Sequence, residues 1–226
     1  LLARTNPDTA KKYDGLSFIL TPMKAEGVRT VPIRKLTGEH GFTQTFFTDA
    51  RAPVEGLVGQ EGGGWKVAMR TLEYERGAKG GQAGGYVSVG SNAWDVLELA
   101  RRMKRDGAPA LEDPILRDRM MDFILEIQSM ALCGQRQAIP DLLADRPAGL
   151  ALSSKLMATE FARRINEFAI RLTGVHGAYY VGDENAVDDG IWTRAYLNSF
   201  SATIGGGTSQ IQHNIIGEHV LGLPKS

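Results

Sequence analysis

The sequence predicts a mainly helical protein with a small β segment, in which short strands precede an antiparallel bundle of long helices. Two observations support this fold class. Residues 1–61 contain short apolar runs separated by proline and glycine, whereas the rest of the chain carries apolar residues at helical spacing. The connections between these amphipathic segments are short, which favours antiparallel packing of neighbouring helices.

Three short strands are expected in the first part of the chain. Leu16–Leu20 is a short apolar run, Thr30–Ile33 is rich in strand-forming residues, and Phe42–Thr48 alternates with Thr and Gln. Residues 1–13 are polar and are predicted to include a surface loop. The run Gly62-Gly63-Gly64 then marks the change from strand to helix.

One long helix is predicted over residues 65–105, although it contains glycines at positions 77, 80, 81, 84, 85 and 90. Each glycine weakens a helix by about 1 kcal/mol relative to alanine. A helix that keeps so many small residues is expected to press closely against another backbone or a ligand.

The second helix has a clear start, with Asp113 as the N-cap and Pro114 as the first helical residue. It is expected to end at Pro140 or at the turn 145–147. Its apolar residues form one stripe that we expect to face the core: Ile115, Met120, Met121, Ile124, Ile127, Ala131 and Leu132.

The third helix is expected from about Leu150 to Thr173, closed by Gly174 as a C-cap. Trp192 to Ala202 is a shorter helix, and Ser209 to about Val220 is the last. The inward positions of the third helix are Leu152, Leu156, Ile165, Phe168, Ala169 and Leu172.

Composition excludes several classes of protein. With 226 residues the chain can bury a core for one large or two modest domains. Its 26 Lys and Arg balance 26 Asp and Glu, so no charge asymmetry indicates nucleic acid or an anionic membrane. No apolar run is long enough for a membrane helix. The single cysteine, Cys133, excludes an internal disulfide and favours a cytoplasmic location. The four histidines lack metal-ligand spacing, so no metal site is expected.

Two stretches carry candidate chemistry. Three glycines, Gly205 to Gly207, lead into Thr208 and Ser209, either of which can cap the following helix. Exposed N–H groups at such a helix start favour an anionic or carbonyl-bearing ligand. Upstream, Glu75 lies close to an apolar helical stripe, which suits it to proton abstraction. The alternative is a solvated surface acid or a partner of Arg76 or Lys79.

The tail GGGTSQIQHNIIGEHVLGLP resembles the C-terminal signature of the acyl-CoA dehydrogenases, flavoenzymes that desaturate acyl-CoA thioesters. Leu16–Pro22, Leu36–Ala52, Leu57–Trp65 and Gly174–Gly177 also match, in the family's order and over nearly the whole chain. The resemblance implies that residues 1–61 are the C-terminal part of the middle β-barrel domain and 62–226 the C-terminal helical bundle domain.

The N-terminal helical domain and the first β segment of the family have no counterpart in this sequence, and Leu1 is not a methionine. The chain is therefore expected to be a fragment of the full enzyme and inactive alone. It should lack flavin, because the missing β segment supplies much of the flavin contact, and yet associate through its bundle.

In most of the family the catalytic base is a glutamate at the position of Gly206. A minority branch, typified by the isovaleryl-CoA and long-chain enzymes, instead carries its base on the first helix of the C-terminal domain. The stretch LEYER, which ends at Arg76, resembles the motif of that branch, and Glu75 aligns with the base. The resemblance implies that Glu75 removes the α-proton while FAD accepts hydride from Cβ. The backbone N–H of Gly206 would stabilise the developing enolate.

The resemblance also implies binding residues. Arg76 matches an arginine that contacts the CoA portion, and Glu73 lies at a substrate-lining position. Thr208 and Gln210 match residues that reach the FAD diphosphate and adenosine.

The turn Gly174–Gly177 resembles a Gly-Gly-x-Gly turn that approaches the FAD of a neighbouring subunit, with Val175 in place of the second glycine and Arg171 in place of a usual glutamine. The family's Arg-x-x-Phe-Gly segment, another FAD contact across the dimer, is not recognisable.

The implied partners are an acyl-CoA substrate from fatty acid metabolism, an electron-transfer flavoprotein or similar acceptor, and further copies in a homodimer or homotetramer. Two alternatives stay open. The chain could belong to a non-catalytic subunit of a heteromeric acyl-CoA dehydrogenase, or to a related flavin oxidase or hydroxylase on the same fold.

Overall fold

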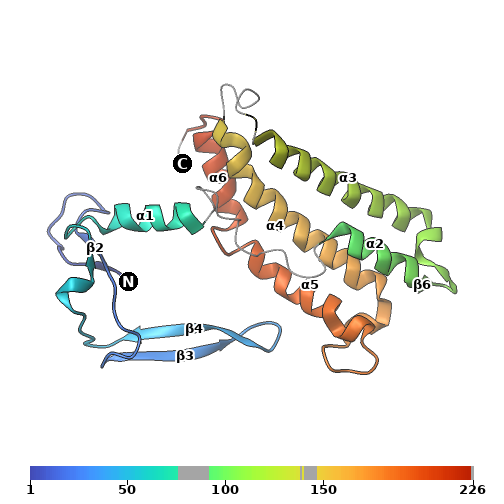
Figure 1. Ribbon diagram of the computed structural model, residues 1–226, viewed down its shortest axis with the longest axis horizontal. Helices are drawn as coiled ribbons and strands as arrows, with labels where there is room; N and C mark the ends of the chain where they lie inside the picture. The colour runs from blue at the N-terminus through green and yellow to red at the C-terminus, as the bar shows by residue number, and fades with distance from the viewer. Residues whose placement is uncertain (76–91, 138, 140–146, 225–226) are drawn as a thin grey trace. The chain divides into compact units, whose positions relative to one another are not determined.

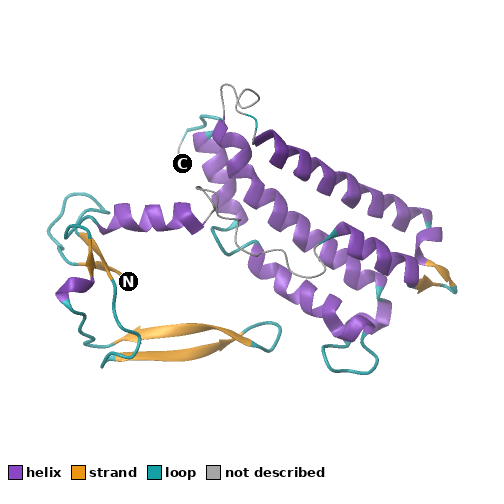
Figure 2. Ribbon diagram, viewed as in Figure 1, coloured by secondary structure: helices purple, strands orange, loops and turns teal. Residues whose placement is uncertain are grey.

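The computed structural model describes residues 1–75, 92–137, 139 and 147–224. The chain divides into two compact units, Leu1–Gly84 and Gly85–Ser226, which are described separately. Helix is the main secondary structure and the strands are few and short (Figure 2), so the expected fold class is confirmed.

The first unit holds two small antiparallel sheets. Strands β1 (Leu2–Arg4), β2 (Leu16–Ile19) and β5 (Leu57–Val58) form one sheet in that order, with the short 3₁₀ helix η1 (Val54–Gly56) before β5. Strands β3 (Val28–Arg34) and β4 (His40–Phe47) form a separate hairpin.

The three expected strands are confirmed, but the polar N-terminal segment is not all loop. Leu2 and Ala3 are half-buried, and they pair with Phe18 and Ser17 of β2. The tertiary pairing outweighs the polar local sequence, which is why the composition of residues 1–13 did not indicate β1.

Helix α1 (Gly64–Glu75) packs against β2 and β1 in the same unit. Its first residue, Gly64, is buried against the backbone of Ser17 and Phe18 on β2. Near the same end of the helix, the ring of Trp65 stacks on Tyr13 with centroids 4.1 Å apart. A glycine at position 64 is therefore what lets the helix approach the sheet so closely.

The second unit is a helical bundle organised around its longest helix (Figure 1). Helix α4 packs against each of the other four helices of the unit. The helices are α2 (Ala93–Arg102), α3 (Pro114–Gln137), α4 (Pro147–Leu172), α5 (Ile191–Ala202) and α6 (Ser209–His219). The connecting elements are β6 (Lys104–Arg105), β7 (Ala108–Pro109), and the 3₁₀ helices η2 (Ala110–Glu112), η4 (Gly174–Ala178) and η5 (Val187–Gly190).

The prediction of one continuous helix over residues 65–105 is wrong, because a separate helix, α2, begins at Ala93 after the extended residue Asn92 and ends at Arg102. Asn92 caps α2 by accepting a hydrogen bond from the Trp94 N–H, 3.1 Å away. Lys104 and Arg105 form a strand of the β6–β7 hairpin, whose turn contains Gly107 at a φ of 84°. The six glycines of this stretch lie outside the described residues.

Local capping signals located the start of α3 and the end of α4 correctly, whereas the expected ends of α3 at Pro140 or 145–147 fall mostly outside the described residues. Asp113 Oδ1 accepts from the N–H groups of Ile115 and Leu116, at 2.8 and 3.4 Å, and Pro114 is the first residue of α3. After α4, Gly174 takes a φ of 58°, as expected of a glycine that ends a helix.

The core of the bundle lies between α2, α3, α4 and α5, with Ile165 of α4 fully buried at its centre. The expected inner face of α4 is confirmed at Leu156, Ile165, Phe168, Ala169 and Leu172. Leu152 lies outside the described side chains.

The expected inner face of α3 is only partly correct. Met120 is buried and Ile124 and Ile127 pack against the core, as expected, and Phe123 is buried with them. The predicted apolar stripe included too many residues, because only the face of α3 that packs against α2 and α4 is covered. Its outer members are exposed: Ile115, Met121, Ala131 and Leu132.

An ion pair joins the end of α2 to η5, which leads into α5. The Arg102 guanidinium donates to both carboxylate oxygens of Asp188, at 3.0 and 2.7 Å, and the Trp192 indole N–H donates to one of them at 2.7 Å. The hydrogen bonds from Arg102 hold the pKa of Asp188 below its ordinary value. Asp188 has a φ of 49°, in the left-handed region that Asn and Asp tolerate best among side-chain-bearing residues.

Asp188→Asn should lower the free energy of unfolding by up to about 1 kcal/mol at neutral pH, the usual range for an exposed ion pair. Because the folded-state pKa of Asp188 is lowered, its contribution is present at neutral pH and is lost as pH falls through the acid range. Urea unfolding should therefore separate the variant from the wild type at pH 7 and bring the two together at low pH.

Asp189→Asn is the matched control, because Asp189 has a similar φ of 54° but accepts from the N–H of Gly182 and not from an arginine. A gap between wild type and Asp188→Asn that does not narrow on acidification would contradict the ion-pair explanation.

Candidate functional site

The glycine turn between α5 and α6 is a tight backbone feature with few side chains. Gly206 and Gly207 have φ values of 65° and 98°, which only glycine adopts without strain. Thr208 caps α6, since its hydroxyl oxygen accepts from the Ile211 N–H at 3.3 Å. The capping role expected of Thr208 is therefore confirmed.

Side chains of α4 and α6 donate hydrogen bonds to the backbone carbonyl groups of this turn. Lys155 of α4 donates to the carbonyl oxygen of Gly207 at 2.7 Å, and Gln212 of α6 donates to that of Gly206 at 3.0 Å. Gln212 is only 3% exposed. We call these two hydrogen bonds the carbonyl clasp.

A third contact fixes the start of α6. The Ser209 hydroxyl donates to Glu160 of α4 at 2.6 Å. Sequence reasoning missed Lys155 and Glu160, because they lie 52 and 49 residues away from their partners in the turn and no local pattern signals contacts of such range. It also missed Gln212, although this residue lies only 6 residues after Gly206.

The amide groups of the turn remain available for a ligand. Within residues 1–75, 92–137 and 147–224, no hydrogen-bond acceptor pairs with the backbone N–H of Gly206, Gly207 or Thr208. The turn is half-buried, so these donors are partly shielded from water. Such a group of N–H donors at a helix start suits a carbonyl oxygen that gains negative charge.

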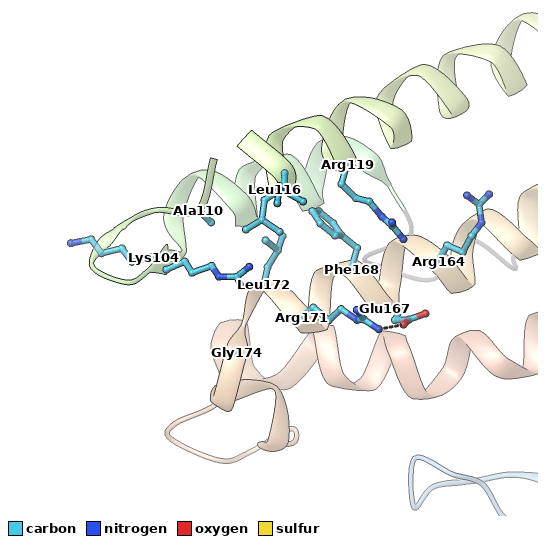
Figure 3. A pocket seen from close by; sticks show the side chains of 12 residues that line it. Lys104, Ala110, Leu116, Arg119, Arg164, Glu167, Phe168, Arg171, Leu172 and Gly174 are labelled. Carbon is cyan, nitrogen blue, oxygen red and sulfur yellow. Dashed lines mark hydrogen bonds and ion pairs between the residues drawn. The ribbon is translucent and has the colours of Figure 1, made fainter. Parts of the chain in front are cut away.

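A second candidate site is a cavity of about 570 Å³ beside the other end of α4 (Figure 3). Residues of β6, η2, the start of α3 and the end of α4 line it. Its apolar wall includes Phe168 and Leu172. Five cationic side chains and one acid line it: Lys104, Arg105, Arg119, Arg164, Arg171 and Glu167.

Three of the cations are partly neutralised by acids. Arg171 donates to Glu167 at 2.6 Å, as Figure 3 shows, Arg164 donates to Glu126, and Arg105 lies 3.7 Å from Asp113. Positive charge still exceeds negative charge around the cavity. The mixture of arginines and apolar surface suits an anionic ligand with a flat, weakly polar part.

The two glycines at the ends of the Gly174–Gly177 turn have different surroundings. Gly174 borders the cavity, and a Cβ there would meet nothing within 4 Å. Gly177 faces its own bundle, because a Cβ would lie 2.8 Å from the side chains of Ile170 and Thr173. The Thr193 hydroxyl also donates to the Gly177 carbonyl at 3.1 Å. Gly177 is thus needed for packing within the chain.

The two candidate sites lie near opposite ends of α4. Thr208 and the exposed Gln210 follow the glycine turn that Lys155 contacts. Arg171 and Gly174 line the cavity. Lys155 and Arg171 are 16 residues apart on one helix, which corresponds to about 24 Å at 1.5 Å per residue.

The expected catalytic and substrate residues of the first helix are only partly covered. Glu75 is the last residue of α1, and Glu73 lies in its final turn. The side chains of both, and the whole of Arg76, lie outside the described residues.

In the described part of the chain, no group of three or more His, Cys, Asp or Glu side chains could hold a metal ion. Likewise, none of the helices described is both long enough and apolar enough to cross a membrane.

Comparison with known proteins places these features in context. Residues 62–221 match the family model described as "Acyl-CoA dehydrogenase, C-terminal domain". The acyl-CoA dehydrogenase IpdE1 of Mycolicibacterium smegmatis is 38% identical over 226 residues, which cover 100% of this chain and 53% of the relative. The chain thus spans about half the length of the curated relatives it matches.

Two solved structures have a similar fold over the whole chain. One, titled "Tcur3481-Tcur3483 steroid ACAD", has a TM-score of 0.81 at 27% identity and is covered over 56% of its length. The other, the ChsE4-ChsE5 complex from Mycobacterium tuberculosis, has a TM-score of 0.78 at 27% identity and is covered over 57% of its length.

Proposed function

Because the chain belongs to the acyl-CoA dehydrogenase family, we propose that it is the C-terminal half of a FAD-dependent enzyme that desaturates an acyl-CoA thioester. The observation that carries this proposal is the glycine turn. Its N–H groups have no acceptor within the described residues, and the carbonyl clasp fixes the neighbouring carbonyl groups. A thioester carbonyl oxygen can therefore be bound at the turn, with Gly206 as its principal donor.

In the proposed reaction Glu75 takes the proton from Cα of the thioester, and bound FAD supplies the acceptor for hydride from Cβ. Gly206 has no side chain that could act as a base, so the proton must go elsewhere. Negative charge that develops on the thioester oxygen is stabilised by the Gly206 N–H. In this proposal Glu75 is the base and the Gly206 N–H stabilises the enolate oxygen, whereas most of the family places both roles at the position of Gly206.

The binding residues are proposed from the same family pattern. Arg76 is assigned to the CoA portion of the substrate and Glu73 to the acyl pocket. Thr208 and Gln210 are assigned to the FAD diphosphate and adenosine. Gln210 is exposed at the first turn of α6, next to the cap, which supports a contact with a ligand lying across the helix start.

We further propose that the cationic cavity, with Gly174 at its wall, holds the diphosphate-bearing part of the FAD of a neighbouring subunit. The donor set fits such a group, since five cations line the cavity beside apolar surface and only three of them pair with an acid in the described residues. The separation of about 24 Å along α4 supports the assignment of the two sites to two FAD molecules. Gly177 would then support the turn from within and would not touch the cofactor.

Arg119→Gln should weaken FAD binding by about tenfold or more in the full-length enzyme, because a hydrogen bond to a charged group contributes about 1.5–3 kcal/mol. Arg119 lines the cavity from α3. The affinity can be measured by titrating the apoprotein with FAD and following the flavin spectrum.

Arg117→Gln is the matched control, since Arg117 is also exposed on α3 but does not line the cavity. Equal loss of FAD affinity in both variants would mean that general surface charge, and not this cavity, attracts the cofactor.

The partner subunit is either a second copy or a different chain. The titles of both structural relatives name two components, which favours a heteromer as the second candidate assembly. In that assembly the chain could belong to a subunit that only lends cofactor contacts. The presence of Glu75 and Arg76 in this sequence favours a catalytic subunit.

One experiment separates these functions. The full-length protein, purified with its partner subunit, is mixed with acyl-CoA thioesters without oxygen, and the flavin absorbance is followed. Loss of absorbance, with turnover by an electron-transfer flavoprotein or artificial acceptor, is the expected result. Rapid turnover with oxygen alone would indicate an oxidase. An unchanged flavin with every acyl-CoA tested would contradict the proposed function.

A further inference from the structure

The carbonyl clasp determines how the glycine turn presents its N–H groups. In a trans peptide the C=O and the next N–H point in opposite directions. The carbonyl of Gly206 shares its peptide with the N–H of Gly207, and the carbonyl of Gly207 shares its peptide with the N–H of Thr208. Because both carbonyls are held by side chains of the protein, these N–H groups are directed away from the clasp.

Lys155 is the charged member of the clasp. The residue is half-buried, and its ammonium group lies 2.7 Å from the Gly207 oxygen. Its Cε lies 3.8 Å from the position that a Cβ on Gly206 would occupy, so the side chain runs directly alongside Gly206. A charged donor holds a carbonyl more strongly than a neutral donor does.

We propose that Lys155 is a positioning residue for the thioester carbonyl: together with Gln212 it holds the two peptides that follow Gly206, and thereby fixes the turn from which the Gly206 N–H donates. This inference rests on the proposed function, in which the Gly206 N–H binds the enolate oxygen. Orientation matters because preorganised donors stabilise the developing charge without rearranging during the reaction. Lys155 acts through the backbone and does not itself touch the substrate.

The test compares Lys155→Met with Lys155→Arg in the full-length enzyme with its partner subunit. Methionine keeps much of the length of the side chain but cannot donate, whereas arginine keeps the charged donor. Removal of a whole oxyanion donor costs about 10²–10³ in kcat, so loss of its positioning residue should slow flavin reduction by about tenfold or more. The KM for the acyl-CoA should change little, because the interaction strengthens in the transition state.

Lys24→Met is the matched control, since Lys24 is exposed in the first unit. The inference predicts a slow Lys155→Met enzyme, substantial recovery in Lys155→Arg, and a wild-type rate in Lys24→Met, all at a similar Tm. A wild-type rate of flavin reduction in Lys155→Met would overturn it and would leave the proposed function intact.

A second measurement does not depend on activity. The amides of Gly205 and Ser209 flank the turn and donate to Ser201 and Thr203, at 2.9 and 3.0 Å. Their hydrogen exchange should be at least several-fold faster in Lys155→Met than in Lys155→Arg. If the wild-type enzyme fails to reduce its flavin, the proposed function is wrong, and this exchange decides the structural role of Lys155. Equal exchange in the two variants would refute that role.

Discussion

Replacing Glu75 with glutamine in the full-length enzyme should slow flavin reduction by acyl-CoA by about 10²–10⁴-fold, the usual contribution of a general base. Glutamine has nearly the same shape as glutamate but cannot accept the α-proton. FAD should stay bound, so the visible spectrum of the resting variant should match that of the wild type. The measurement is the rate of flavin bleaching after rapid mixing with substrate under anaerobic conditions.

Glu26→Gln supplies the control for loss of a negative charge, since Glu26 is exposed in a turn of the first unit. Near wild-type bleaching by the Glu75 variant would mean that another group removes the proton. The base would then have to be sought outside α1, because Gly206 offers no side chain.

Gly64→Ala should destabilise the protein by about 3 kcal/mol, at the upper end of the usual cost of overpacking. The added methyl group would overlap the backbone of Ser17 and Phe18 on β2, which cannot move aside as a flexible side chain can. Since α1 also ends at Glu75, the variant should show slower flavin reduction together with a lower Tm.

Gly134→Ala is the opposite case and serves as the control. Gly134 is exposed on α3, and a Cβ there would meet nothing within 4 Å. Alanine is favoured over glycine inside a helix by about 1 kcal/mol, so this variant should be more stable than the wild type. An unchanged Tm in Gly64→Ala would show that α1 does not need close contact with the sheet.

Features that depend on a few adjacent residues were predicted well from the sequence. The start of α3 followed from Asp113 and Pro114, and the cap of α6 from Thr208, because a helix N-terminus is specified by the side chains next to it. The family resemblance was confirmed by the match over residues 62–221. That match begins at the boundary proposed for the helical domain, although α1 packs on the strands of the first unit.

Features that depend on distant residues could not be predicted. Strand β1 exists because Leu2 meets Phe18, and the wide stripe assigned to α3 was wrong because its width is set by α2 and α4. Helical periodicity shows which residues are apolar, but the neighbouring helices decide which of them are covered. The catalytic assignment of Glu75 stays a prediction, because its side chain lies outside the described residues.

The placement of the two sites at opposite ends of α4 has a genetic consequence if the proposed function holds in a homodimer. Each active centre then takes its base and glycine turn from one copy and its cationic cavity from the other. Consider a dimer of one copy with a defective base and one copy with a defective cavity. One active centre then combines the defective base with the defective cavity, whereas the other combines the intact base with the intact cavity. Two alleles that are each inactive alone would therefore complement one another in the same cell, up to half of the normal activity per mixed dimer.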